Sequence, residues 1–143
     1  MAITQANKIG LVLCLCASSS VFGEPSRVCE LAVKHGGLAQ FAVQVDPDQD
    51  GSRIVKADID LDGSGDELRW RESGSTFTLT LTSNGKRFSL EEQRLAVVLF
   101  ESRYYVVTTR LESGLGPWYR EVFAVTRAGI DRICSFEGKG QVP

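Results

Sequence analysis

Histidine is almost missing from this chain of 143 residues, in which His35 is the only example. The chain also has no H-E-x-x-H motif, no G-x-S-x-G motif, no glycine-rich phosphate loop and no Cys/His zinc spacing. Catalysis needs several groups placed together, and a lone histidine beside glycines is typical of a helix end or a surface position. These absences predict that the protein is not an enzyme.

A pair of carboxylates is the catalytic arrangement that the composition still permits, because glycoside hydrolysis relies on two such groups. Glu112 and Glu121 form one such pair, on either side of a loop that contains glycine and proline. Nothing in the sequence distinguishes them from the many other acidic residues. A small hydrolase is therefore kept only as an alternative.

The chain has no excess of basic residues and no long apolar segment. Its 16 Lys and Arg stand against 18 Asp and Glu, so it lacks the basic surface that general nucleic-acid binding requires. The apolar run at residues 9–17 is shorter than the roughly 20 residues of a transmembrane helix. We predict no nucleic-acid partner and no transmembrane segment in the mature chain.

The same apolar run predicts export. Lys8 precedes it, three serines follow it, and Val21 and Gly23 occupy the positions that a signal peptidase inspects. We predict a signal peptide at residues 1–23 and a single β-rich domain at 24–143, in the periplasm or secreted. A lipoprotein is the alternative, because two cysteines lie in the run. A leucine precedes each of them, however, where lipidation requires a small residue.

Only two cysteines, Cys29 and Cys134, remain after the signal is removed. In an oxidising compartment such a pair predicts a disulfide bond. The bond would close a loop of about 105 residues and stabilise the fold by about 4–5 kcal/mol in the loop-entropy model. The alternative is two buried free thiols.

Alternation of apolar and polar residues dominates the mature chain, whereas helical periodicity is scarce. Residues 75–90 are the clearest hairpin, because Asn84-Gly85 supplies the two positive-φ residues of a type I′ turn. Further strands are predicted at 38–45, 53–60, 67–73, 118–126 and 130–137, and two more within 95–110, joined at Glu101–Arg103. We predict a mainly β fold, a single antiparallel domain built as a sandwich, a barrel or a partial propeller.

Helix is predicted in two places. Residues 25–37 begin with Ser26 as a cap and end at glycines, which favours a short N-terminal helix. Residues 89–94 can form a single helical turn. The disulfide would then join the N-terminal segment to the last strand.

The stretch DIDLDGSGDE, at residues 58–67, spaces its acids as a cation-binding loop does. Asp58, Asp60 and Asp62 take positions 1, 3 and 5, and Asp66 takes position 9. A glycine at position 6 permits a sharp turn, and Ser64 offers a backbone carbonyl at position 7. Because Ca²⁺ prefers six to eight oxygen ligands, the stretch predicts a Ca²⁺ site at these residues. The alternative is an acidic, solvated turn.

This stretch resembles the D-x-D-x-D-G-x-x-D calcium loop of FG-GAP and VCBS-type repeats, which links two β-strands. The resemblance implies that the same five residues are ligands, the aspartates through their side chains and Ser64 through its carbonyl. A helical EF-hand does not fit, because Arg69 stands at position 12, where a bidentate glutamate is expected. The resemblance covers about ten residues, and the chain is too short for an FG-GAP propeller. The adhesive function of that family is therefore not carried over.

A shorter echo, DPDQDG, lies at residues 46–51 and repeats the first three acids of this spacing. Its ninth position is Ile54, so one ligand is missing, and Pro47 constrains the turn. The echo predicts an ordinary polar connection, with a weaker second ion site as the alternative. In both cases the first third of the mature chain carries a strong negative field.

The stretch ESGLGPWYRE, at residues 112–121, is a candidate contact surface for a partner protein. It places Trp118, Tyr119 and Arg120 after a turn, and these residue types dominate interface hot spots. Strand alternation predicts that at least one of the two aromatic residues is buried as core. Partner contact and a purely structural role of the loop both remain open.

Together these features predict an exported, non-catalytic binding protein with a protein partner. In size, compartment and lack of catalytic motifs, the chain resembles periplasmic inhibitors of lysozyme-like enzymes and immunity proteins against cell-wall toxins. An acidic surface would suit a basic target. A calcium-stabilised structural or carbohydrate-binding envelope protein is one alternative, and the small hydrolase is the other.

Overall fold

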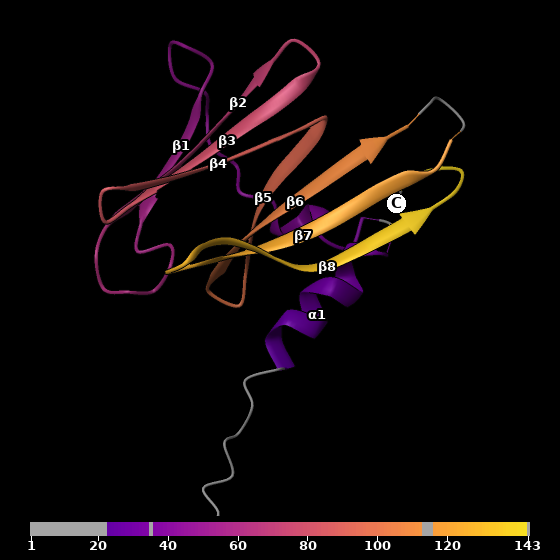
Figure 1. Cartoon of the computed structure of the whole chain (residues 1–143), viewed down its shortest axis with the longest axis horizontal. Coiled ribbons are helices and arrows are strands. Elements are labelled where there is room, and N and C mark those ends of the chain that lie inside the picture. Colours follow the sequence, from indigo (N-terminus) through magenta and orange to yellow (C-terminus); the bar gives the residue numbers. More distant parts are fainter. Residues whose placement is uncertain (1–22, 35, 113–115, 143) are drawn as a thin grey trace, which may run out of the picture.

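A computed structural model describes residues 23–34, 36–112 and 116–142 (Figure 1). The chain is mainly β, as predicted, with two four-stranded antiparallel sheets in which neighbouring strands follow chain order. The first sheet consists of β1 (Arg53–Ala57), β2 (Asp66–Ser73), β3 (Thr76–Ser83) and β4 (Lys86–Glu92). The second consists of β5 (Arg94–Phe100), β6 (Arg103–Leu111), β7 (Trp118–Thr126) and β8 (Gly129–Gly138). The described residues form one α-helix, α1 (Gly23–Ala32), and no closed barrel.

The two sheets share one hydrophobic core. Leu68, Leu79 and Leu81 of the first sheet are completely buried, and they belong to the same cluster as Val97 and Val106 of the second sheet. Apolar residues at every second position of β2 and β3 give the first sheet one apolar face, and burying that face requires a second layer. Of the predicted β architectures, the described residues therefore match a sandwich.

A second core lies on the opposite face of the second sheet, under α1. Val28 and Ala32 of the helix are buried in one cluster with Val98 and Val122. Figure 1 shows the resulting three layers, with the β5–β8 sheet between α1 and the β1–β4 sheet. The predicted disulfide is confirmed, and it joins α1 to β8.

That disulfide links Cys29 to Cys134, with their Cα atoms 6.3 Å apart.

Two tight turns follow from local sequence. Asn84 and Gly85 have φ angles of 49° and 72°, which confirms the predicted type I′ turn between β3 and β4. Glu101 and Ser102 also have positive φ angles, and they join β5 to β6.

The strand predicted at 38–45 is wrong. The segment forms a short 3-10 helix, η1 (Ala39–Phe41), followed by a single bridge between Ala42 and Val98. Phe41 packs in the α1 core, whereas Val43 packs in the core between the sheets. The segment therefore crosses the edge of the second sheet, which prevents its apolar residues from sharing one face.

The helix predictions also need correction. The helix α1 ends at Ala32, earlier than the glycines, and the Lys34 amide donates to the Leu31 carbonyl at 3.2 Å to close the last turn. The turn predicted at 89–94 is absent, because β4 continues to Glu92 and only Gln93 separates it from β5. No helix in the described part of the chain has the length and apolar character needed to cross a membrane.

Candidate metal site

The acidic stretch forms the turn of the β1–β2 hairpin. Ala57 pairs with Asp66 at the end of the ladder, so residues 58–65 leave and re-enter the sheet at the same point. Leu61 (φ 60°) and Gly63 (φ 90°) adopt the left-handed conformation, which is unusual for leucine. Arg127, from the turn between β7 and β8, donates to the Leu61 carbonyl at 3.2 Å. The loop is thus held in a tight curl.

Asp66 is the most deeply buried acid of this loop, with 4% of its surface exposed. Its Oδ2 atom accepts hydrogen bonds from the amides of Ile59 (2.9 Å) and Asp60 (3.2 Å). Its Oδ1 atom is buried and has no hydrogen-bond partner among the described residues. Leaving a buried carboxylate oxygen without a partner costs free energy, so this atom is suited to a bound cation.

Asp58 and Asp60 lie next to Asp66. Each of the three residues offers a carboxylate oxygen, and these oxygens lie within 4.8 Å of one another. Asp60 is buried and Asp58 is exposed. No lysine or arginine in the described parts of the chain forms an ion pair with any of the three. Their mutual repulsion is therefore not offset by a direct ion pair with a described side chain.

Local hydrogen bonds determine the orientation of these carboxylates. Asp58 accepts from the amides of Asp62 (2.9 Å) and Gly63 (3.0 Å). Asp60 accepts from the Asp62 amide (3.1 Å) and from the Ser83 hydroxyl (3.0 Å). Backbone amides of the loop, together with the Ser83 hydroxyl, thus hold both side chains in place.

Asp62 and Ser64 lie beside this cluster and not within it. The Asp62 carboxylate accepts from the Ser64 amide at 2.8 Å and from the Asn84 side-chain amide. The Ser64 hydroxyl, followed by the Ser64 amide and Asn84, lowers the pKa of Asp62 to about 2. Of the five predicted ligands, the structure brings together the side chains of Asp58, Asp60 and Asp66.

Ser83 and Asn84 are the residues that sequence reasoning missed. They belong to the end of β3 and the turn that follows it, and their side chains hydrogen-bond to Asp60 and Asp62. The strand order β1-β2-β3 places this turn and the acidic loop at the same end of the sheet. An open hollow of about 840 Å³ lies between them. The Asn84-Gly85 motif predicted the turn, but nothing local connected it with the acidic loop.

The echo at residues 46–51 has a different environment. The Asp48 carboxylate accepts from the amides of Asp50 (3.1 Å) and Ser52 (2.9 Å). The Arg69 guanidinium lies 4.0 Å from the Asp48 carboxylate and 3.8 Å from that of Asp50. An arginine thus supplies the positive charge here, as expected of a polar connection between strands.

The three predicted contact residues of the 112–121 stretch do not share one face. Trp118 is 7% exposed, and its burial confirms that one of the two aromatics belongs to the core. The Arg120 guanidinium lies 5.7 Å from the centre of the Trp118 ring, on the α1 side of the sheet. Tyr119 points to the other face, where the Arg110 guanidinium lies 5.2 Å from its ring. Residues 113–115 of this loop lie outside the described residues.

The residues considered for catalysis do not form a site among the described residues. Glu121, one half of the carboxylate pair considered for hydrolysis, accepts from Arg132 at 2.5 Å, so its carboxylate is held in an ion pair. His35 lies outside the described residues, as do residues 1–22 of the predicted signal peptide. Neither observation assigns a catalytic group.

Comparison of this chain with protein-family models, with curated proteins and with solved structures finds no match. No activity or ligand can therefore be carried over from a relative.

Proposed function

We propose that this protein is an exported, non-catalytic binding protein that holds one Ca²⁺ ion in its β1–β2 loop. The observation that carries the calcium proposal is the Asp66 Oδ1 atom, which is buried without a hydrogen-bond donor in the described chain. It belongs to a cluster of three carboxylates that form no ion pair with a described side chain. A bound cation would supply the missing partner and offset the repulsion at the same time.

The donor set favours a hard cation. Asp58, Asp60 and Asp66 offer carboxylate oxygens, and calcium accepts an irregular shell of six to eight such ligands. The open hollow beside the loop gives an ion and its water ligands access from solvent. Asp62 and Ser64, which lie next to the cluster, are the residues that would complete the shell. These features, with the resemblance to the FG-GAP type of loop, support calcium over magnesium, which demands regular octahedral geometry.

The role of the ion would be structural. The loop already contacts the β3–β4 turn through Ser83 and Asn84, and the β7–β8 turn through Arg127. An ion that holds the loop rigid would therefore stabilise one end of the sandwich across both sheets. A rigid group of turns is a suitable platform for binding, because less conformational entropy is lost on association.

Export is supported by two independent features. The pattern of residues 1–23 is that of a signal peptide, and the Cys29–Cys134 disulfide is typical of an oxidising compartment. The protein is accordingly proposed to act in the periplasm or as a secreted protein.

The partner is proposed to be a basic protein, of the class of cell-wall-degrading enzymes. The mature chain would carry 15 basic and 18 acidic residues, a net charge of −3, because the signal takes away Lys8 and no acid. An acidic surface attracts a basic partner and speeds their encounter. Inhibition of such an enzyme is the activity that this charge and the resemblance to periplasmic inhibitors support.

Calcium binding is tested by thermal unfolding of the purified protein in EDTA and across a calcium series. The melting temperature should rise with calcium concentration, and the free energy of unfolding should gain about 2.7 kcal/mol at one hundred times Kd. Asp58→Asn removes one exposed ligand and should weaken the calcium response. Asp46→Asn, an identical change of charge outside the cluster, should leave it intact. A melting temperature that stays constant through millimolar calcium would identify the loop as an acidic turn.

Inhibition is tested separately, by the rate at which a lysozyme-like enzyme clears a cell-wall suspension, with calcium present. The protein should slow the enzyme, and added salt should relieve the inhibition because it screens the charges of both partners. An enzyme that is unaffected by an excess of the protein would rule out this target class and leave the calcium result untouched.

A further inference from the structure

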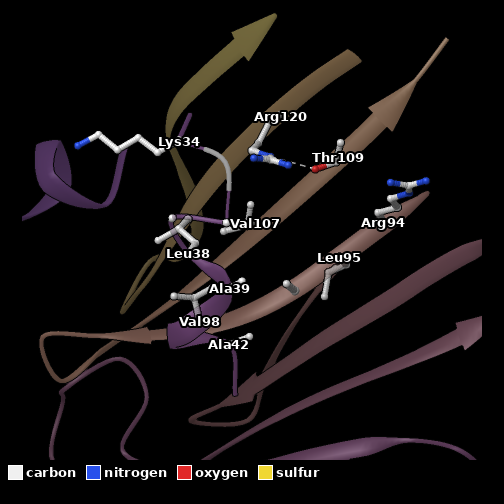
Figure 2. A pocket seen from close by; sticks show the side chains of 13 residues that line it. Lys34, Leu38, Ala39, Ala42, Arg94, Leu95, Val98, Val107, Thr109 and Arg120 are labelled. Carbon is white, nitrogen blue, oxygen red and sulfur yellow. Dashed lines mark hydrogen bonds between the residues drawn. The ribbon is translucent and has the colours of Figure 1, made fainter. Parts of the chain in front are cut away.

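A pocket of about 220 Å³ lies between η1 and the α1 side of the second sheet, away from the acidic loop. Figure 2 shows Leu38, Ala39 and Ala42 on one side of it and the strands β5 to β7 on the other. The pocket is smaller than the about 300–1,000 Å³ of sites for drug-sized ligands. A pocket of this size therefore has room only for a ligand smaller than a typical drug molecule.

The strand register builds the polar end of this pocket. Arg94 of β5 pairs with Thr109 of β6, and Thr109 pairs with Arg120 of β7. Residues paired in this way point to the same face of the sheet. Since neighbouring strands are about 4.8 Å apart, the Cα atoms of the two arginines lie about 10 Å apart, with a threonine between them. An anionic group of a ligand fits between two such guanidinium groups.

The next rows of the same face are apolar. Ala96 pairs with Val107, and Val98 follows two residues further along β5. Ala96 is exposed although it lies within a strand, because the small side chain leaves space below η1. One end of the pocket is thus cationic, and the remainder is lined by alanine, valine and leucine.

The charged residues among the described lining of the pocket are all basic. Its described lining includes Lys34, Arg94 and Arg120 and no carboxylate, although the chain as a whole has a net charge of −2. Figure 2 shows the Lys34 amino group turned away from the pocket, so the two arginines provide the charge near it.

Arg120 is fixed in position before any ligand binds. It donates to the Ala32 carbonyl at 2.7 Å and to the Thr109 hydroxyl at 3.2 Å. Burial lowers the pKa of its guanidinium, which means that the positive charge is partly desolvated. A nearby anion would stabilise such a charge.

We infer that this pocket binds a small amphiphilic anion, a medium-chain aliphatic carboxylate, with its carboxylate between Arg94 and Arg120 and its chain under η1. The carboxylate matches the planar donors of arginine. The aliphatic chain matches the apolar rows and gains free energy from leaving water. This site is separate from the calcium loop, and it would function whether or not that loop binds an ion.

Titration calorimetry with octanoate below its micelle concentration tests the inference, with acetate and 1-octanol as probes that keep only one half of the ligand. Octanoate should bind at least about tenfold more tightly than either probe, because 1-octanol lacks the charge-assisted hydrogen bond to arginine and acetate lacks the apolar chain. Equal affinity for 1-octanol and octanoate would overturn the inference, because the arginines would then play no part. Association with anionic lipid vesicles but not with monomeric octanoate would also overturn it.

Variants locate the site. Ala96→Leu fills the pocket from an exposed position and should abolish octanoate binding without lowering the melting temperature. Arg94→Glu reverses the charge at the polar end and should weaken binding at least about fivefold. Arg87→Glu, the same change at an exposed residue of β4 in the other sheet, should have no effect. Octanoate affinity that survives Ala96→Leu, or that falls equally in both arginine variants, would show that the ligand does not occupy this pocket.

Discussion

Removing the disulfide should have the largest effect on stability of any single covalent change in this fold. Cys29 and Cys134 are separated by 105 residues, so the bond restricts almost the whole unfolded domain. The loop-entropy relation gives about 4.8 kcal/mol at 25 °C for a loop of this length. For about 120 ordered residues, the entropy of unfolding is about 0.25 kcal/mol per kelvin. The double variant Cys29→Ala, Cys134→Ala should therefore melt about 15–20 °C below the wild type.

The structure also predicts which part of the fold would unfold first without the disulfide. The helix α1 contacts the second sheet through Val28 and Ala32, and Arg120 donates to its last carbonyl. These contacts are few compared with those of a strand that pairs along its whole length. Without the disulfide, α1 should separate from β8 before the two sheets unfold, and its amides should exchange first.

The assay is circular dichroism with temperature, combined with hydrogen exchange of the α1 amides. Reduced wild type is the control, and it should melt at the temperature of the double variant, whereas reductant should not change the variant itself. A double variant that melts within about 3 °C of the oxidised wild type would refute the reasoning. The bond would then impose little restriction on the unfolded chain.

Two further changes test other parts of the fold. The Ser52 hydroxyl, followed by Asp48, lowers the pKa of Asp50 from 3.8 to about 2, so its contribution to stability is complete above about pH 4 and is lost as the pH falls toward 2. Asp50→Asn should flatten the pH dependence of urea unfolding in that window, and an unchanged slope would contradict this. A Cβ atom at Gly138 would lie 2.1 Å from the Trp118 ring, so Gly138→Ala should destabilise the protein by about 1–3 kcal/mol in urea unfolding. Gly65→Ala, where a Cβ atom would meet nothing within 4 Å, is the control and should be nearly neutral.

Local patterns were sufficient to predict most of the strands and the mainly β class. Alternation in β2 and β3 predicted which residues enter the core, because a strand turns successive side chains to opposite faces. The Asn84-Gly85 turn followed from the positive φ angles that only a few residues adopt easily. The segment at 38–45 was predicted incorrectly because its alternation is the same whether it pairs along a strand or crosses the edge of a sheet.

The sequence alone determined the spacing of acids in the β1–β2 loop, the choice of the two cysteines that pair, and the alternation that makes this a β protein. Each of these depends on neighbours along the chain or on a simple count. Tertiary structure decided which acids meet and which residues of other turns contact them. Asp62 lies beside the cluster and bonds to Asn84, whereas Ser83 bonds to Asp60 within the cluster. It also decided that Arg94, Thr109 and Arg120 form one row. Strand order and register set these contacts, and both arise from packing between segments distant in sequence.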